Sequence, residues 1–81
     1  MNVMDAEMFE YYDREMVKLI SRKYGYEHMH ALREFLKSET RVMLEDPEQA
    51  MWEFSPLALF DIWEAEKVTG DPRNSVYIRC D

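Results

Sequence analysis

The chain has 81 residues and a formal net charge of −7. This length allows one domain with a thin stability margin, because so short a chain buries only about 60% of its unfolded surface. The negative charge argues against binding to nucleic acid or to an anionic membrane through general electrostatics. No apolar run is long enough for a transmembrane helix, and the N-terminus lacks the features of a signal peptide, so we expect a cytoplasmic protein. The single cysteine, Cys80, excludes an internal disulfide and is expected to be a free thiol.

The first predicted helix covers residues 5–24. Asp5 is a suitable N-cap, and Gly25 is suited to the left-handed conformation that ends many helices. Apolar residues recur at the three- and four-residue spacing of an amphipathic helix. They are Met8, Phe9, Tyr12, Met16, Leu19 and Ile20.

The second predicted helix covers residues 26–45. Met29, Leu32, Leu36 and Met43 lie along one face of this helix, which Phe35 and Val42 widen. Ser38 and Thr40 weaken the middle of this segment, so a kink or break is predicted near Ser38.

Two further helix starts are predicted where a residue that can cap a helix N-terminus is followed by proline. Asp46-Pro47 begins a short third helix over residues 47–54, and Ser55-Pro56 begins a fourth over residues 56–69. Along the fourth helix, Leu57, Phe60 and Trp63 form one row, with Leu59, Ile62 and Val68 beside it. Gly70 ends this helix, and residues 71–81 are predicted to be an extended tail packed on the bundle. The triplet at 76–78 is β-like but too short to predict as a strand. The sequence therefore predicts an all-α fold, a small bundle of three to four helices with an extended C-terminal tail.

Charge is distributed unevenly along the chain. Residues 1–15, 16–37, 38–66 and 67–81 carry −4, +3, −7 and +1. The basic second segment is predicted to pack against the acidic third. The alternative is an acidic face that receives a basic partner, or that mimics DNA if its carboxylates are spaced like phosphates.

The residue pattern gives little indication of a metal-binding or catalytic site. His28 and His30 lie about 200° apart on a helix, so they cannot ligate one metal together. Glu27 and His30 form one Glu-x-x-His motif, whereas helical di-iron bundles use two, so a homodimer would have to supply the second. A metal- or ligand-binding bundle across a homodimer is therefore kept as an alternative. We nominate no catalytic, cofactor-binding or metal-binding residue, and we expect no enzyme.

A helix-turn-helix over the third and fourth predicted helices is compatible in spacing but not in chemistry. A recognition helix uses Arg, Lys, Asn or Gln near its N-terminus. Here that region reads Pro-Leu-Ala-Leu-Phe-Asp over residues 56–61. No nucleic-acid partner is expected.

The candidate surface is aromatic and acidic. The chain has 11 aromatic residues (2 Trp, 5 Tyr and 4 Phe) and 7 Met, and these types are enriched at protein interfaces. Packing in the core is the alternative use for the same residues. The predicted interaction surface comprises Trp52, Phe54, Phe60, Trp63, Glu64 and Glu66. The predicted function is a protein–protein interaction or regulatory and accessory module that forms a homo-oligomer, with no membrane partner.

Two C-terminal stretches carry a resemblance. They are Met-Trp-Glu-Phe-Ser-Pro at residues 51–56 and Thr-Gly-Asp-Pro-Arg-Asn-Ser at residues 69–75. The segment between and including them looks similar to small uncharacterised helical proteins of gut Firmicutes. The resemblance covers the C-terminal third and implies no activity and no functional residue.

Overall fold

The computed structural model describes residues 5–78, and this part of the chain is helical without any strand. The α-helices are α1 (Ala6–Tyr24), α2 (His28–Leu36), α3 (Glu39–Glu45) and α4 (Pro56–Thr69). Three short 3₁₀ helices follow α3 and α4, namely η1 (Pro47–Gln49), η2 (Met51–Glu53) and η3 (Pro72–Asn74). The predicted all-α small bundle is confirmed. Cys80 lies outside the described residues.

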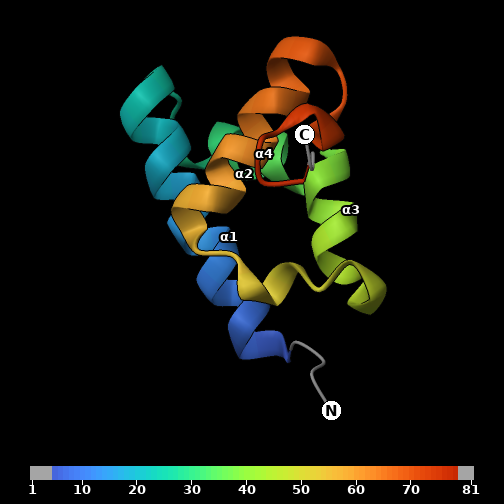
Figure 1. Cartoon of the computed structure of the whole chain (residues 1–81). Helices are drawn as coiled ribbons and strands as arrows, with labels where there is room; N and C mark the ends of the chain where they lie inside the picture. Colours follow the sequence, from blue (N-terminus) through green and yellow to red (C-terminus); the bar gives the residue numbers. More distant parts are fainter. Residues whose placement is uncertain (1–4, 79–81) are drawn as a thin grey trace.

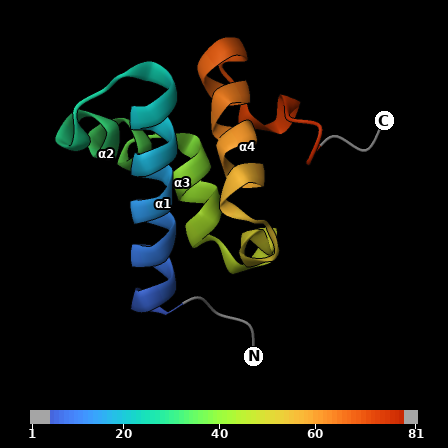
Figure 2. The same cartoon turned by 90° about the vertical axis from the view of Figure 1, so that its left-hand side faces the viewer.

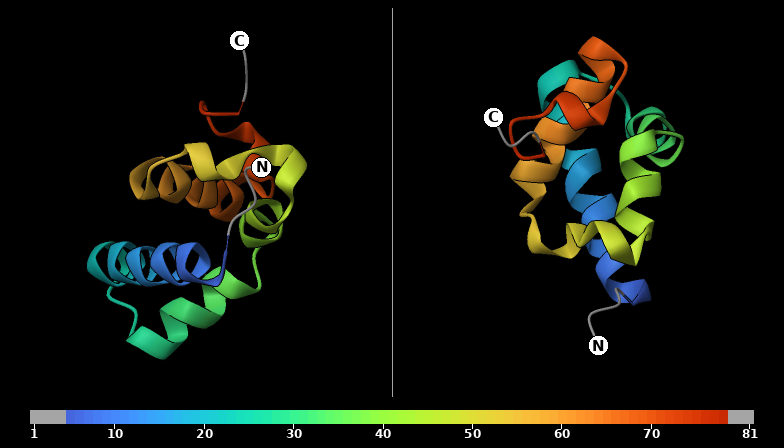
Figure 3. Two further views of the ribbon diagram at one scale, coloured as in Figure 1. Left: turned by 90° about the horizontal axis from the view of Figure 1, so that it is seen from below. Right: turned by 45° about the vertical axis from the view of Figure 1, so that its right-hand side comes forward.

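The helices pack around the pair formed by α1 and α4 (Figure 1). These two helices lie side by side and run in the same direction, while the shorter α3 descends beside them (Figure 2). Seen from below, α2 lies on the side of α1 that faces away from α4 (Figure 3). Helix α2 packs mainly against α1 and α3, and one flank of it lies outside the bundle. Within the described residues, no helix combines the length and the apolar character needed to cross a membrane.

Helix α1 has the predicted boundaries because both caps form. The carboxylate of Asp5 accepts a hydrogen bond from the backbone N–H of Met8 at 2.9 Å. At the other end Gly25 adopts a left-handed conformation with φ 72°, and its N–H donates to the carbonyl of Ser21. A residue with a Cβ is disfavoured at this φ, which makes glycine the natural terminator.

The segment predicted as one helix over residues 26–45 is two helices, broken at Ser38 as expected. The Ser38 hydroxyl donates to the carbonyl of Phe35 at 2.6 Å and accepts from the N–H of Arg41 at 3.1 Å. One side chain thus closes α2 and caps α3. The first of the two helices begins at His28, where the carboxylate of Glu27 accepts from the N–H of His30 at 3.0 Å.

The single apolar face predicted for this segment is divided between core and surface. Ala31 and Phe35 are fully buried, whereas Met29 and Leu36 are exposed. The break at Ser38 changes the helical phase, so the stripe that was read continuously from residue 29 to 43 does not exist. Val42, placed at the edge of that stripe, is also exposed.

The predicted third helix over residues 47–54 is also wrong. It is replaced by η1 and η2, which are separated by Ala50 in a left-handed conformation with φ 52°. The hydroxyl of Tyr12 in α1 donates to the carbonyls of Trp52 and Phe54, at 3.2 and 2.5 Å. This contact gives a donor to two carbonyls at the end of the segment, and Met51 is buried in the core beneath the turn.

Helix α4 matches its prediction, with a Ser55 cap and Gly70 at its end. Its buried face contains Leu59, Ile62 and Trp63, while Leu57 and Val68 are exposed. In α4 as well, the apolar residues cover a wider part of the helix surface than the part that is buried in the core.

The C-terminal segment folds back on α4 in place of the predicted extended tail. Pro72 is buried, η3 packs against α4, and the Ser75 hydroxyl donates to Asp61 at 2.7 Å. Residues 76–78 form a turn, so the β-like triplet makes no strand within the described chain.

One core joins all four α-helices. Its buried members are Tyr12, Met16, Val17, Ile20, Ala31, Phe35, Met43, Leu44, Met51, Leu59, Ile62 and Trp63.

Candidate functional site

The predicted aromatic surface over residues 52–66 is largely part of the fold. Trp63 is only 4% exposed, and Phe60 is half-buried with its ring stacked on Trp63 at a centroid distance of 6.0 Å. Trp52 and Phe54 are half-buried and pack against the core. The four aromatic side chains therefore support the core more than they form an exposed patch.

Glu64 holds together the ends of α1 and α4. Its Oε2 atom accepts from the hydroxyl of Tyr24 at 2.5 Å and from Nζ of Lys23 at 2.7 Å. The hydrogen bond to Glu64, with burial and the nearby negative charge, raises the pKa of Tyr24 to about 12. Burial raises the pKa of Glu64, but the hydrogen bonds from Lys23 and Tyr24 outweigh it and lower this pKa overall. The Lys23–Glu64 ion pair joins segment 16–37 to segment 38–66, whereas Lys18 and Lys37 pair with Glu15 and Glu34 outside the acidic segment.

The ammonium group of Lys67 lies in a cage of three aromatic rings. Its Nζ lies 5.2 Å, 5.6 Å and 5.7 Å from the ring centroids of Tyr24, Tyr26 and Trp63. It also contacts the Tyr26 hydroxyl at 3.1 Å. Cation–π attraction of this kind stabilises a partly exposed ammonium group, so this cage is already filled by the chain's own lysine.

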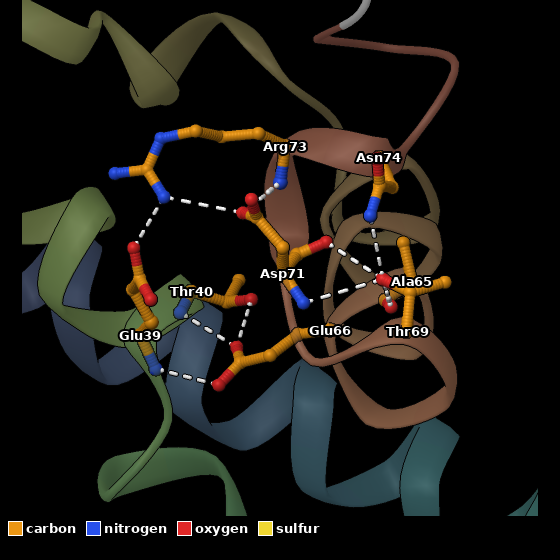
Figure 4. A network of polar contacts seen from close by, with 8 residues as sticks. All are labelled: Glu39, Thr40, Ala65, Glu66, Thr69, Asp71, Arg73 and Asn74. Atoms are coloured by element: carbon orange, nitrogen blue, oxygen red, sulfur yellow. Dashed lines mark hydrogen bonds and ion pairs between the residues drawn. The ribbon is translucent and has the colours of Figure 1, made fainter.

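Glu66 caps α3 from α4 (Figure 4). Its carboxylate accepts from the backbone N–H groups of Glu39 and Thr40, both at 2.9 Å, and from the Thr40 hydroxyl at 2.7 Å. A carboxylate at this position satisfies free amide groups and complements the positive end of the helix. Glu66 is therefore a structural residue and not part of an exposed acidic surface.

A polar network continues from this cap to η3 (Figure 4). Arg73 forms an ion pair with Glu39 and contacts Asp71 at 3.2 Å. The Thr69 hydroxyl accepts from the N–H of Asp71 at 3.2 Å and from the side-chain amide of Asn74 at 2.9 Å. These contacts fasten the C-terminal turn to α3 and α4.

Most carboxylates of the acidic segment have internal partners, which leaves little for a DNA-like face. Six of the eight acids in residues 38–66 accept hydrogen bonds: Glu39, Glu45, Asp46, Asp61, Glu64 and Glu66. Paired carboxylates on several different elements do not present the regular row of free charges that mimicry of DNA requires.

The histidine motif is also used by the fold. The carboxylate of Glu27 caps α2, and these backbone hydrogen bonds lower its pKa. The ring of His30 stacks on Tyr26 at a centroid distance of 4.1 Å and lies 3.7 Å from Glu34. Among the described residues, no group of three or more His, Cys, Asp or Glu side chains is arranged to hold a metal ion.

A groove with a volume of about 610 Å³ lies open to solvent between α1 and α2. We call it the α1–α2 groove, and its lining comprises Glu10, Asp13, Arg14, Val17, Lys18, His28, Met29, Leu32 and Leu36. The groove lies along the flank of α2 that is outside the bundle.

One wall of the α1–α2 groove is apolar. Met29 is 54% exposed and Leu36 is 45% exposed, with half-buried Leu32 between them. These three positions lie within about 60° of one another on a helix of about 3.6 residues per turn. They form a stripe beside the buried face of Ala31 and Phe35, so α2 is apolar toward both the core and the groove.

The other wall is charged and belongs to α1. Val17 is nearly buried at its base, and Glu10, Arg14 and Lys18 follow one another at four-residue spacing. Asp13 in this wall is already paired with the buried side chain of Arg41. Sequence reasoning missed this site because it placed Met29, Leu32 and Leu36 on one apolar face that continues to Met43. The sequence did hold a signal for this site. If the helix breaks at Ser38, the short helix before it has large apolar residues on more than one face, and one of these faces must be exposed.

No family model, curated protein or solved structure matches this chain in the three comparisons. The resemblance of residues 51–75 to proteins of gut Firmicutes thus stays a prediction.

Proposed function

We propose that this chain is a small helical protein-interaction module with a regulatory or accessory role, and that its contact surface is the α1–α2 groove. One observation carries the proposal: the Met29–Leu32–Leu36 stripe is exposed beside a groove of about 610 Å³. Contiguous exposed apolar surface rimmed by polar residues is typical of protein interaction sites.

The energetics favour an apolar protein segment in the groove. Full burial of a Met or Leu side chain contributes about 1.5–3 kcal/mol, so two half-exposed anchors supply a substantial part of a micromolar affinity. Methionine adapts its shape to a partner because its side chain is unbranched and flexible. An apolar stripe at helical spacing fits the mode in which helices pack into each other's grooves.

Site-specific photo-crosslinking tests this proposal. A photoreactive phenylalanine analogue replaces Met29 in cells that express the chain, and a matched chain carries it at Leu57. Leu57 is 68% exposed and does not line the α1–α2 groove. We expect a discrete protein adduct from position 29 and none of the same mass from position 57.

Leu36→Glu in the chain with the probe at position 29 provides the second arm. Placing a charge in the apolar wall should reduce the yield of that adduct severalfold, while circular dichroism reports an unchanged helix content. Adducts that are identical from positions 29 and 57, or that are insensitive to Leu36→Glu, would refute the groove as the contact surface.

A further inference from the structure

We infer that the occupant of the α1–α2 groove is a second copy of this chain, joined about a two-fold axis. This inference rests on the proposed function, because it names the partner of the same surface. It is carried by the charge balance of the groove, by two unpaired charges on its α1 wall, and by the apolar stripe on α2.

The groove is the neutral part of a strongly acidic chain. Its lining holds two acids, Glu10 and Asp13, and two bases, Arg14 and Lys18, so its net charge is zero. The rest of the chain then carries 15 acids and 8 bases, which is the whole net charge of −7. Two copies at −7 repel each other over most of their surfaces. Across the neutral groove this general repulsion is small.

Two charges of opposite sign are free to pair across such an interface. Glu10 and Arg14 are exposed, and within residues 5–78 neither side chain forms an ion pair or hydrogen bond. They lie one helical turn apart on α1. When α1 runs antiparallel to α1 of the second copy, Glu10 faces Arg14 of the partner subunit, and the two-fold axis repeats this pair. A wall with one acid and one base at this spacing is therefore complementary to itself.

The apolar wall has the same self-complementary property. An isologous interface buries each copy's Met29–Leu32–Leu36 stripe against the other copy's α1–α2 groove, so one interface covers the stripes of both copies. A standard interface takes about 800 Å² from each partner, which is about 15% of the 5202 Å² surface of this chain.

The inference is tested by charge reversal in the full chain, read by sedimentation equilibrium from about 1 to about 100 µM. We expect the wild type to be a dimer at the upper concentrations. Glu10→Arg and Arg14→Glu should each weaken dimerisation about tenfold, because each turns two attractive pairs into repulsive ones. The double variant Glu10→Arg/Arg14→Glu restores both pairs and should regain the wild-type dissociation constant.

Glu48→Arg is the matched control, because it makes the same charge change at an exposed position outside the groove. It should not weaken dimerisation, and circular dichroism should give the same helix content for all four variants. Leu36→Glu should abolish the dimer. A wild-type monomer at about 100 µM, or a dimer that resists both single reversals and Leu36→Glu, would overturn the inference.

The two proposals fail separately. If the wild type is monomeric but the probe at position 29 captures a different protein, the second copy is excluded and the interaction module stands. If the position-29 adduct has the mass of two copies of this chain, both are supported.

Discussion

Arg41 is a nearly buried cation that joins α1 to α3. Its Nε and Nη2 atoms bind the two carboxylate oxygens of Asp13 at 2.8 and 3.1 Å, and Nη1 binds Glu45 at 2.6 Å. Its guanidinium also lies 4.7 Å from the centroid of the Phe9 ring. A planar group with several donors suits this geometry, and lysine could not replace it.

We expect Arg41→Ala to lower the free energy of unfolding by about 3 kcal/mol, because removing one partner leaves the partly buried Asp13 carboxylate without compensation. Urea denaturation followed by circular dichroism measures the change. Arg33→Ala, at an exposed arginine, is the control and should change stability by less than about 0.5 kcal/mol. Equal losses in both variants would contradict the assigned role of Arg41.

Glu66 makes a comparable connection between α4 and α3. Glu66→Ala should cost about 1–2 kcal/mol, since two backbone N–H groups and one hydroxyl lose their acceptor. The amides of Glu39 and Thr40 should also exchange their hydrogens faster in this variant. Glu53→Ala, at an exposed acid, should leave both readouts unchanged. Unaltered exchange at residues 39 and 40 in Glu66→Ala would be incompatible with a capping role.

At the scale of elements, local signals predicted the ends of the helices well. Asp5, Ser55, Gly25 and Gly70 cap or end the predicted helices, because each acts on backbone groups a few residues away. The long-range contacts were not predictable. Nothing in the sequence near Glu66 or Arg41 indicates that these residues reach α3 or α1, because their partners are set by tertiary packing.

The same distinction explains the missed site. Met29 and Leu36 have the spacing of a core stripe, and spacing alone does not tell which of two apolar faces packs inward. Because the helical phase changes at Ser38, the face of α2 that packs inward is the one with Ala31 and Phe35. The turn over residues 47–54 was missed for a related reason: its start signal at Asp46-Pro47 is the same for a 3₁₀ helix as for an α-helix.

Ala50 offers a test of that turn. It adopts φ 52°, where a Cβ is unfavourable and glycine is not. We expect Ala50→Gly to stabilise the protein by about 0.5–1 kcal/mol, as measured by thermal or urea unfolding. Ala65→Gly in the middle of α4 is the opposite control and should destabilise by about 1 kcal/mol. Destabilisation by both substitutions would refute the left-handed conformation at residue 50.

For the whole molecule, the carboxylates determine how stability changes with pH. Hydrogen bonds from Lys37 lower the pKa of Glu34, and hydrogen bonds from Arg73 lower that of Asp71. The pKa of Glu64 is lowered as well, by Lys23 and Tyr24 against the opposing effect of burial. A carboxyl group with a lower pKa in the folded chain binds fewer protons there than in the unfolded chain at acid pH.

Stability should therefore be fully present above the ordinary carboxyl pKa of about 4.3 and should fall as the pH decreases through the lowered values. Urea midpoints measured from pH 7 down to pH 3 follow this loss. Glu64→Gln should be less stable at neutral pH and should show a shallower decline, because one of the linked groups is removed. A variant with the wild-type slope would contradict the contribution of Glu64.

The cap that Glu66 places on α3 also imposes an order of assembly. At seven residues α3 is too short to persist alone in water, and its first free amides wait for a carboxylate 26 and 27 residues further along the chain. While the chain is being synthesised, we expect α3 to lack this acceptor until residue 66 has emerged. Until then the segment that carries the apolar stripe on α2 lies next to an unfinished half of the protein.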